Sequence, residues 1–492
     1  MSDIYVPGIK SRFNSEKIIE GLMQVESIPK ERTEKSIENL GNTKSWWDDL
    51  GRRVSSLRDS ARMLFSYQNP FNERNAVSSN ENIITAAASR EAEKREYQFA
   101  VKQLAQADRF LSPPVDEKTA IDPGSYVFSV GKEEISFDFK GGSLREFVDM
   151  INRRGRGMIS ASFMTVQPGT KSVLVESKIT GAENSLGFSG TGAAADLAEK
   201  MKAVAAAQDA IISMEGIEMS RPSNVINDII PGVTVTARGV SEWPQRLEIQ
   251  ADREGIKEAI FSMVGNYNRL MAEINVLTAR RVSSGLETRL DDSIINELAY
   301  LTADEAAEMK KRLGAFSGDS MLLQYRSNLM RAVSSPYPTD EGQDLAVLSQ
   351  IGISTNALGS SGAGYTPSRL RGYLEIDEKK LDAAVENHLP AIRQLFASDT
   401  SGDLLADTGV AFNLDDISRP LVEKGGIISL KTGTIDSRIS QDKRRIETME
   451  RQLAAKEADL KMQYGRMESA YERMEKMSSS LDNFSKQNSN NR

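Results

Sequence analysis

The sequence IDSRISQDKRRIETMERQLAAKEADLKMQYGRMESAYERMEKMSSSLDNF, at residues 435–484, is apolar at every seventh position. That row consists of Ile439, Ile446, Leu453, Leu460, Met467, Met474 and Leu481. The companion row is mixed, and no proline follows Pro420. The pattern predicts one helix, roughly 75 Å long, with an apolar seam along one side. A helix of this length cannot bury its seam alone, so it needs a partner.

A second heptad segment lies near the other end of the sequence. Its two rows contain Leu40, Trp47, Val54 and Ala61, and Thr43, Leu50, Leu57 and Leu64. Before it, the spacing of Ile18, Leu22 and Val25 predicts a marginal helix that closes at Ile28-Pro29. Because both segments carry an unsatisfied apolar stripe, we expect the two ends of the chain to pack together in one helical bundle, with the middle of the chain as an insertion.

The heptad positions give a set of candidate interface residues. Trp47 belongs to a heptad row and is expected in the core, whereas Trp46 points elsewhere and is a candidate inter-subunit contact. The methionines of the last segment either fill a core or form an adaptable surface for changing neighbours. The candidate coiled-coil and oligomer interface consists of Leu40, Trp46, Trp47, Leu50, Val54, Leu57, Ile439, Ile446, Leu453, Leu460, Met467, Met474 and Leu481.

The chain between these ends alternates between helical and strand-like patterns, which predicts a multi-domain α+β fold with terminal helices as the base and inserted β-rich domains. We expect four parts: terminal helical segments at 1–39 and 435–492, a helical stalk domain at 40–69 and 253–434, a β-rich domain at 70–123 and 207–252, and a small inserted α/β module at 124–206.

Individual elements follow from the same patterns. Helices are expected at 83–94, 143–151, 193–206, 253–278, 298–313, 321–333, 344–350, 378–386 and 390–397, with a tether at 399–430. Strands are expected at 97–104, 125–130, 134–139, 158–166, 171–176, 211–219, 233–237 and 246–249.

Composition restricts the function. The net charge of −8 makes nucleic acid and anionic membrane surfaces improbable partners. The absence of cysteine removes disulfides and thiolate chemistry, and the single histidine, His388, is expected at the surface at a helix end. We find neither a bilayer-spanning apolar run nor a signal peptide, so the protein is expected either in the cytosol or exported without a cleavable signal.

Three short motifs match signatures of ligand-binding or catalytic sites, but each lacks the sequence context that such a site requires. Residues 190–195, GTGAAA, match a dinucleotide-binding fingerprint, but no buried parallel strand precedes them, so we do not expect nucleotide binding. The KTG at 431–433 and the SIPK at 27–30 imitate penicillin-binding motifs, but they lie at opposite ends of the chain. No nucleophile–base pair or metal-ligand set is present, so we expect no cofactor and no enzymatic activity.

A series of motifs resembles one known family, in the right order and over nearly the whole chain. They are VKQLA at 101–105, the segment 144–152, AQDA at 207–210, EGI at 215–217, RPSNVINDIIPGVTV at 221–235, NYN at 266–268, GDS at 318–320, IGI at 351–353, GYLEIDEKKL at 372–381, LF at 395–396 and GGI at 425–427. On these motifs the chain resembles the bacterial flagellar filament cap proteins, also called the hook-associated protein 2 family.

The resemblance implies a folded-back molecule whose termini form the helical base, in a homo-oligomeric ring of about five copies at the filament tip. It also implies flagellin, the flagellar export apparatus and a chaperone as partners. The expected location is the distal tip of the flagellum, extracellular or, for internal flagella, periplasmic. The alternatives are another flagellar axial protein, such as a hook–filament junction protein, or a flagellum-associated adhesin.

Overall fold

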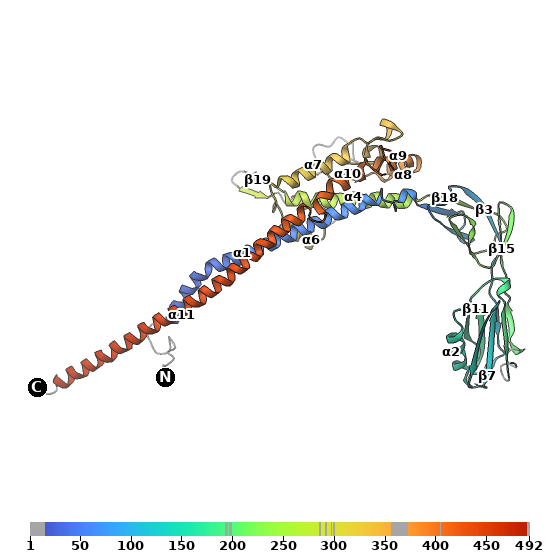
Figure 1. Cartoon of the computed structure of the whole chain (residues 1–492), viewed down its shortest axis with the longest axis horizontal. Helices are drawn as coiled ribbons and strands as arrows, with labels where there is room; N and C mark the ends of the chain where they lie inside the picture. Colours follow the sequence, from blue (N-terminus) through green and yellow to red (C-terminus); the bar gives the residue numbers. More distant parts are fainter. Residues whose placement is uncertain are drawn as a thin grey trace. The chain divides into compact units, whose positions relative to one another are not determined.

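The computed structural model describes residues 15–191, 195, 199–284, 287–290, 293–296, 298, 301–355, 372–403 and 405–489. The chain forms two compact units (Figure 1). The first contains the chain up to residue 67 together with the chain from residue 257, and the second contains residues 68–256. The ends of the chain therefore belong to one unit, and the middle of the chain forms the other.

The first unit is helical. Its long helices are α1 (Ser15–Met63), α4 (Arg253–Leu277), α7 (Ser320–Ser334), α10 (Val410–Val422) and α11 (Ile427–Ser489). The first turn of α4, residues 253–256, is assigned to the second unit. Short helices are α5 (Ser293–Asn296), α6 (Ala303–Lys311), α8 (Glu378–Asn387) and α9 (Leu389–Phe396), with 3-10 turns η3 (Gly342–Leu345) and η4 (Leu348–Ile351). Two small hairpins complete it: β19 (Arg281–Ser284) with β20 (Glu287–Leu290), and β21 (Ile353–Ser354) with β22 (Glu375–Ile376).

The core of this unit lies where the second half of α1 meets α10 and the start of α11. Apolar side chains of α1 at heptad spacing are completely buried there, as are large side chains of α4. The fully buried set includes Leu50, Val54, Leu57, Ala61, Ile260, Tyr267, Leu270 and Ile274. Burial of this stripe supplies most of the stabilisation of such helices, because intrinsic helix propensity alone is weak.

The second unit contains two apolar cores, each between antiparallel sheets. The first core lies between the sheet β1-β18-β3-β14-β15 and the sheet β16-β17-β2. The strands of the larger sheet are β1 (Arg74–Ser78), β18 (Gln245–Ala251), β3 (Glu96–Gln103), β14 (Ala210–Met214) and β15 (Ile217–Arg221). Those of the smaller one are β16 (Val225–Ile230), β17 (Val233–Ala237) and β2 (Ile84–Ala88), and η1 (Pro70–Asn72) precedes β1.

The second core belongs to a small α/β module. One sheet has the order β10-β11-β4-β13, with β5 also on β11, and the other has the order β12-β7-β8. The first is built from β10 (Ile159–Gln167), β11 (Thr170–Ser177), β4 (Arg109–Leu111), β13 (Lys202–Ala205) and β5 (Val115–Asp116). The second is built from β12 (Leu186–Gly190), β7 (Gly124–Val130) and β8 (Glu133–Phe139); β6 (Ala120–Ile121) pairs with β9 (Gly142–Ser143), and η2 is Ala182–Asn184.

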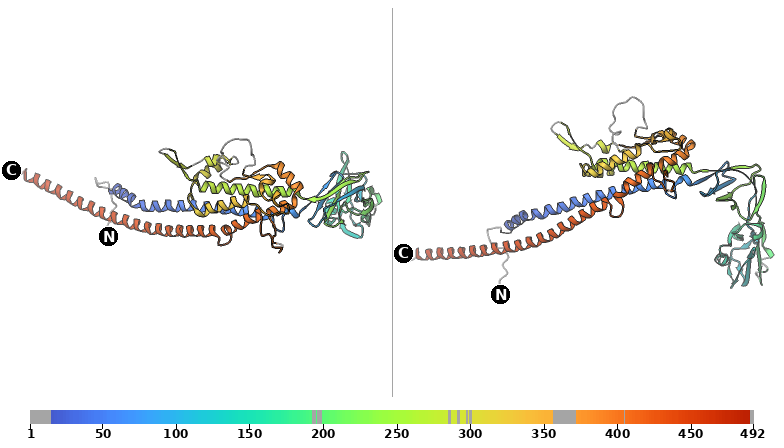
Figure 2. Two further views of the ribbon diagram at one scale, coloured as in Figure 1. Left: turned by 90° about the horizontal axis from the view of Figure 1, so that it is seen from above. Right: turned by 45° about the horizontal axis from the view of Figure 1, so that its top comes forward.

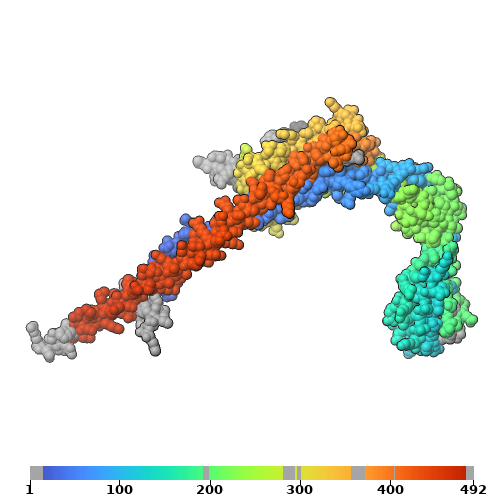
Figure 3. All heavy atoms as spheres, viewed as in Figure 1, coloured from blue at the N-terminus to red at the C-terminus, as the bar shows by residue number. Residues whose placement is uncertain are grey.

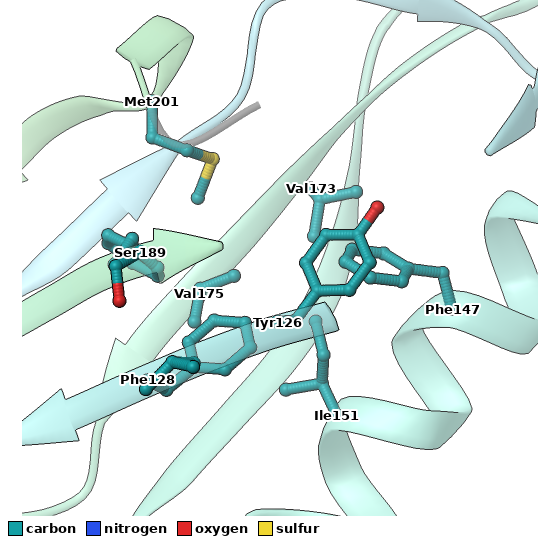
Figure 4. Close-up of a pocket in the computed structure, with 10 residues that line it drawn as sticks. Tyr126, Phe128, Phe147, Ile151, Val173, Val175, Ser189 and Met201 are labelled. Carbon is teal, nitrogen blue, oxygen red and sulfur yellow. The ribbon is translucent and has the colours of Figure 1, made fainter. Parts of the chain in front are cut away.

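Helix α2 (Leu144–Arg154) covers this second core. A capping box starts the helix, because Glu146 N–H donates to Ser143 Oγ while Ser143 N–H donates to the Glu146 carboxylate at 2.8 Å. Aromatic rings of Tyr126, Phe128 and Phe147 surround a cavity of about 20 Å³ (Figure 4). That volume holds nothing larger than a water molecule, so the space belongs to core packing and is not a ligand pocket.

Several predicted elements are confirmed with small shifts in their ends, including the helices at 253–278, 321–333, 378–386 and 390–397 and the strand at 233–237. The short helix expected at 344–350 forms as two 3-10 turns.

Three predictions in the chain's middle are wrong. The helix expected at 83–94 contains strand β2 instead, because Ala86 pairs with Val235 and sheet formation overrides the helix propensity of alanine. The strand expected at 211–219 is a hairpin, turned by Glu215 and Gly216 with φ of 51° and 81°. Within the expected helix 193–206, residues 202–205 form a strand, while 193–194 and 196–198 lie outside the described residues.

The tether expected at 399–430 is also wrong in part, because it contains helix α10. This helix packs on α1, α7 and α11, so tertiary contacts order a segment that reads as a linker. Pro420 within it falls in the third turn of the helix, which hides the helical pattern from a sequence-based prediction.

Candidate interaction surface on the terminal helices

Helices α1 and α11 lie side by side in opposite directions (Figures 1 and 2). Polar contacts along their length fix this arrangement, because rising residue numbers in α1 meet falling numbers in α11. The contacts are Ser15 with Glu468, Lys30 with Glu450 at 2.7 Å, and Lys44 with Asp436 at 2.8 Å. The two chain ends therefore form one antiparallel helical pair, as the two heptad segments predict.

The charged contacts define which residues face each other. The hydrogen bond from the Lys30 ammonium to Glu450 raises the pKa of Lys30, and the bond from Lys44 to Asp436 raises the pKa of Lys44 in the same way. All four side chains remain substantially exposed to solvent, so each pair adds little stability. The two ion pairs favour one register of α1 against α11, because a shift of either helix would separate the opposite charges.

Helix α1 continues through Pro29, so the prediction that a first helix closes at Ile28-Pro29 is wrong. A proline inside a helix removes one backbone hydrogen bond and costs about 3 kcal/mol. Contacts on both sides offset this cost: Ile19 and Thr33 are buried, and Lys30 bonds to Glu450. The Thr33 hydroxyl also donates to the carbonyl of Pro29 at 2.9 Å. Packing against α11 therefore makes one helix out of two predicted ones.

The predicted row of α11 divides into two parts. Ile439, Ile446, Leu453 and Leu460 are half-buried along α11, as is Leu40 on α1. After Leu460 the buried positions are Gly465 and Glu468, with Tyr464 half-buried beside them, and Glu468 is only 2% exposed. An α-helix with 3.6 residues per turn drifts away from a strict seven-residue repeat, which moves the contact face in this way.

The last part of the predicted row is exposed to solvent. Met467, Met474 and Leu481 are 46%, 67% and 63% exposed, and Met477 is 68% exposed. This stretch of α11 continues beyond Ser15, where the described part of α1 begins (Figure 3). The interface role of these three predicted residues remains a prediction, because α1 does not bury them.

The predicted interface residues in the second half of α1 lie in the core of the chain. Leu50, Val54 and Leu57 are completely buried. Trp47 stacks on Phe316 with ring centroids 4.3 Å apart. These side chains are satisfied within one chain, so they stabilise the unit and are not free to bind a second one.

Lys431 of α11 contacts both the ring of Trp47 and the carboxylate of Asp319. Its ammonium lies 4.5 Å above the Trp47 ring and 2.6 Å from the Asp319 carboxylate. Trp46 is half-buried and meets the edge of Phe316 at 6.4 Å. Trp46 therefore has an intramolecular contact and still presents part of its ring to solvent.

A buried ionic cluster beneath α1 has no counterpart in the heptad analysis. Glu273 of α4 is completely buried and lies 2.7 Å from Arg312 and 3.3 Å from Arg53, and Arg312 also lies 3.1 Å from Asp49. Burial alone would lower the pKa of Arg312, but the charges of Glu273 and Asp49 outweigh it and raise that pKa. The sequence signal is a single carboxylate in the apolar run LMAEINVL at 270–277.

A second buried carboxylate, Asp415 of α10, connects that helix to α1. Its carboxylate lies 2.6 Å from Arg58 Nε and 2.9 Å from Arg419. In the next turn of α10, Ser418 and the Tyr325 hydroxyl lie 2.8 Å apart. Both contacts come from the segment that the sequence pattern identifies as a tether.

The first half of α1 presents a second apolar face that its pairing with α11 leaves exposed. Ile18, Leu22, Val25 and Ile28 are 41%, 42%, 64% and 39% exposed. Their spacing of three and four residues places them on one side of the helix, about 100° around it from the buried Ile19. We call these four residues the outer stripe. Exposed apolar stripes of this kind mark protein interaction sites.

The single histidine, His388, lies at the surface as predicted and contacts one carboxylate. His388 Nδ1 lies 2.8 Å from the Glu341 carboxylate at a helix end, on the surface. Within the described ranges no group of three or more acidic or histidine side chains is positioned to hold a metal ion. In the same ranges no helix combines the length and apolar character needed to cross a bilayer.

Paired terminal helices around inserted β-rich segments, with interaction surfaces made of helical stripes, define a structural protein of the assembly-forming class. Family models agree: the one for the C-terminal part of flagellar hook-associated protein 2 matches residues 207–476, and the one for its N-terminal part matches residues 11–108. The chain belongs to the flagellar hook-associated protein 2 family.

Individual relatives span almost the whole chain. It is 29% identical to flagellar hook-associated protein 2 of Treponema maltophilum, over 90% of this chain and 93% of the relative, and 24% identical to that of Treponema pallidum, over 89% and 93%. Among solved structures, the flagellar cap protein of Escherichia coli matches with a TM-score of 0.53 at 24% identity, covering 80% of this chain and 99% of that one. That likeness shows a shared fold.

The prediction of a flagellar filament cap protein is confirmed by the family. The chain is a structural protein of the flagellum and not an enzyme, and its place is the distal end of the filament. The predicted α+β architecture with a terminal helical base and inserted β-rich segments is likewise confirmed.

Proposed function

We propose that several copies of the chain associate through their terminal helices into a ring at the filament tip. The ring guides incoming flagellin subunits into the lattice and prevents their loss. The chain reaches the tip through the flagellar export apparatus, delivered by a chaperone. The family resemblance implies a copy number of about five, and a closed ring fits the symmetry of most homo-oligomers.

The outer stripe is the observation that carries this proposal. Its four apolar side chains project from a helix whose other apolar face is already occupied by α11. Burying four such side chains against another copy contributes several kcal/mol, since each gives about 1.5–3 kcal/mol on complete burial. In a ring, this face of one subunit meets a different face of the next one, because a head-to-tail contact is what closes a cyclic assembly.

Two substitutions in the outer stripe test the proposal. The pair Leu22→Asp and Val25→Asp introduces charge at the proposed contact while leaving Ile19, on the α11 side, unchanged. We expect the native mass of the purified protein to fall from that of the oligomer to that of the monomer. Gln24→Asp, an exposed change on the same turn of α1, is the matched control and keeps the oligomer.

The same variants are then tested for filament growth. Cells carrying the double variant export flagellin into the medium and build short filaments, whereas the Gln24→Asp control builds normal ones. An oligomeric mass and filament length unchanged by the double variant contradict the proposal. Electron microscopy of the labelled chain separates the tip from the hook–filament junction.

We also propose four structural parts, with one adjustment of the expected boundaries. Strands β4 and β5, at residues 109–116, pair with β11 of the module, so its start belongs near residue 107 and not at 124. Gln106 and Gln208 exchange two backbone hydrogen bonds at the point where the chain enters and leaves it. The other three parts keep the boundaries predicted from the sequence.

A further inference from the structure

The methionines that the structure describes differ widely in their exposure to solvent. Met263 and Met271 of α4 are completely buried, and Met309 of α6 is 5% exposed. Four methionines of α11 are instead 50%, 46%, 67% and 68% exposed: Met462, Met467, Met474 and Met477. Exposed thioethers are therefore concentrated on one short stretch of one helix.

Three of these four side chains share one side of α11. Met474 follows Met467 by seven residues, and Met477 follows Met474 by three. These spacings keep the three side chains within about 80° around the helix axis and about 15 Å along it. This part of α11 continues beyond Ser15, where the described part of α1 begins. We call Met467, Met474 and Met477 the methionine row.

The sulfur atoms of the methionine row are open to reaction. None of them accepts a hydrogen bond from the residues that the structure describes. Met462 differs, because the Arg466 guanidinium donates to its sulfur at 3.6 Å. Arg473, next to Met474, donates instead to the carbonyl of Ser469 at 3.2 Å. An exposed thioether with unengaged lone pairs is the group that peroxides oxidise to a sulfoxide.

We propose that the methionine row is a site of reversible oxidation by hydrogen peroxide. A lone pair of the sulfur attacks one peroxide oxygen, so that an S–O bond forms as the O–O bond breaks. The departing hydroxide takes the proton of the transferred hydroxyl and becomes water. Sulfur thereby loses the two electrons that the peroxide gains, and the product is methionine sulfoxide.

The reverse step needs a methionine sulfoxide reductase and a dithiol. The dithiol supplies two electrons and becomes a disulfide, and the sulfoxide oxygen leaves as water. An enzyme can reach the row on the folded chain because its side chains are exposed on a helix surface.

Oxidation of the row changes the surface of the chain and not its fold. A sulfoxide is polar, so three of them replace an apolar row on α11 by a polar one. Sulfoxides at Met263 or Met271 would disrupt a core, whereas those of the row disturb no buried packing. The row is thus a polarity switch at the end of α11, and it does not depend on the proposed ring.

Peptide mass spectrometry after brief treatment of the full-length protein with hydrogen peroxide measures the site directly. We expect Met474 and Met477 to be oxidised about tenfold or more faster than Met263 and Met271, because oxidation follows solvent exposure. Met449, half-buried on the part of α11 that pairs with α1, is the internal reference and reacts more slowly than Met474. Rates for Met474 and Met477 no higher than that of Met449 overturn the proposal.

A triple variant separates the row from the other methionines. Met467→Leu, Met474→Leu and Met477→Leu keep an apolar, helix-forming side chain at each position and remove its sulfur. After complete oxidation of the exposed methionines, the unsubstituted protein should have gained three more oxygen atoms per chain than the variant. Both proteins should keep the melting temperature of the helical signal in circular dichroism within about 2 °C, since changes at exposed side chains affect stability little.

Treatment of the folded, oxidised protein with methionine sulfoxide reductase and dithiothreitol should then remove those three oxygen atoms. Two further results overturn the proposal. A melting temperature that falls on oxidation in the unsubstituted protein and not in the triple variant shows that the row supports the fold. Sulfoxides of the row that the reductase removes only after the chain is unfolded show that the site is not reversible.

Discussion

The ammonium of Lys30 lies 2.7 Å from the carboxylate of Glu450, which joins a residue near the start of the chain to one near its end. Together with the pair of Lys44 and Asp436, it makes the ends of the chain two sides of one helical hairpin. The β-rich middle is an insertion between those sides. The pairing of α1 with α11 leaves apolar side chains of both helices exposed to solvent, among them Leu22 on α1 and Met474 on α11.

Charge exchange tests the register of the hairpin. Lys30→Glu places two carboxylates together and lowers the melting temperature of the helical signal in circular dichroism. Adding Glu450→Lys restores the attraction in reversed order and recovers most of the loss. The effect shrinks at high salt because Glu450 is exposed and Lys30 is only partly buried. A double variant no more stable than Lys30→Glu alone contradicts this register.

The buried ionic cluster gives the largest expected change from a charged residue. Arg312→Ala leaves the completely buried carboxylate of Glu273 with the more distant Arg53 as its remaining cation and lowers the free energy of unfolding by about 3–5 kcal/mol. Urea denaturation followed by circular dichroism measures the change. Lys310→Ala, at an exposed side chain two residues before Arg312, is the control and changes stability little. A loss for Arg312→Ala as small as the control's contradicts the role given to the cluster.

The neighbouring tryptophans are expected to respond differently. Trp47→Ala removes a buried ring stacked on Phe316 and lowers the free energy of unfolding by about 3–5 kcal/mol. Trp46→Ala lowers it much less, because Trp46 is only half-buried. Native mass spectrometry of the Trp46→Ala variant decides whether its exposed part contacts another copy: a weakened oligomer supports that contact, and an unchanged one excludes it.

The module boundary predicts a clean deletion. Replacing residues 107–207 by a short glycine linker between Gln106 and Gln208 leaves the remaining chain folded, because these two residues are already paired through their backbones. Thermal unfolding of the helical signal should keep its midpoint. A deletion of 124–206 instead removes the partners of β4 and should expose apolar surface, seen as increased dye binding. Equal behaviour of both deletions contradicts the shifted boundary.

Periodicity predicts the helical base well, for physical reasons. Leu50, Val54 and Leu57 are buried where the heptad pattern places them, because a helix that must bury one side repeats its apolar residues regularly. The hairpin of α1 and α11 follows from two complementary segments. The heptad pattern places Met467 in the contact face, but the structure buries its neighbour Glu468 instead. The reason is that an α-helix has 3.6 residues per turn, so a strict seven-residue repeat gradually turns away from the partner helix.

The rest could not be predicted because contacts distant in sequence decide it. Strand β2 looks helical until Ala86 is paired with Val235, and Pro29 looks like a helix end until α11 supports it. The cluster around Glu273 requires arginines from two other segments of the chain. Local patterns are informative where the interacting residues are close in sequence and uninformative where they are not.

The pairing of the two chain ends is tested most directly by distances between spin labels, which the absence of cysteine makes straightforward. With labels at Lys35 and Arg445, both exposed, double electron–electron resonance should give a short distance. Moving the second label to Arg473, 28 residues further along α11, should lengthen it by about 40 Å, as expected for an antiparallel helical pair at 1.5 Å per residue. A long distance for the first pair, or one that shortens for the second, would contradict the folded-back base on which the account rests.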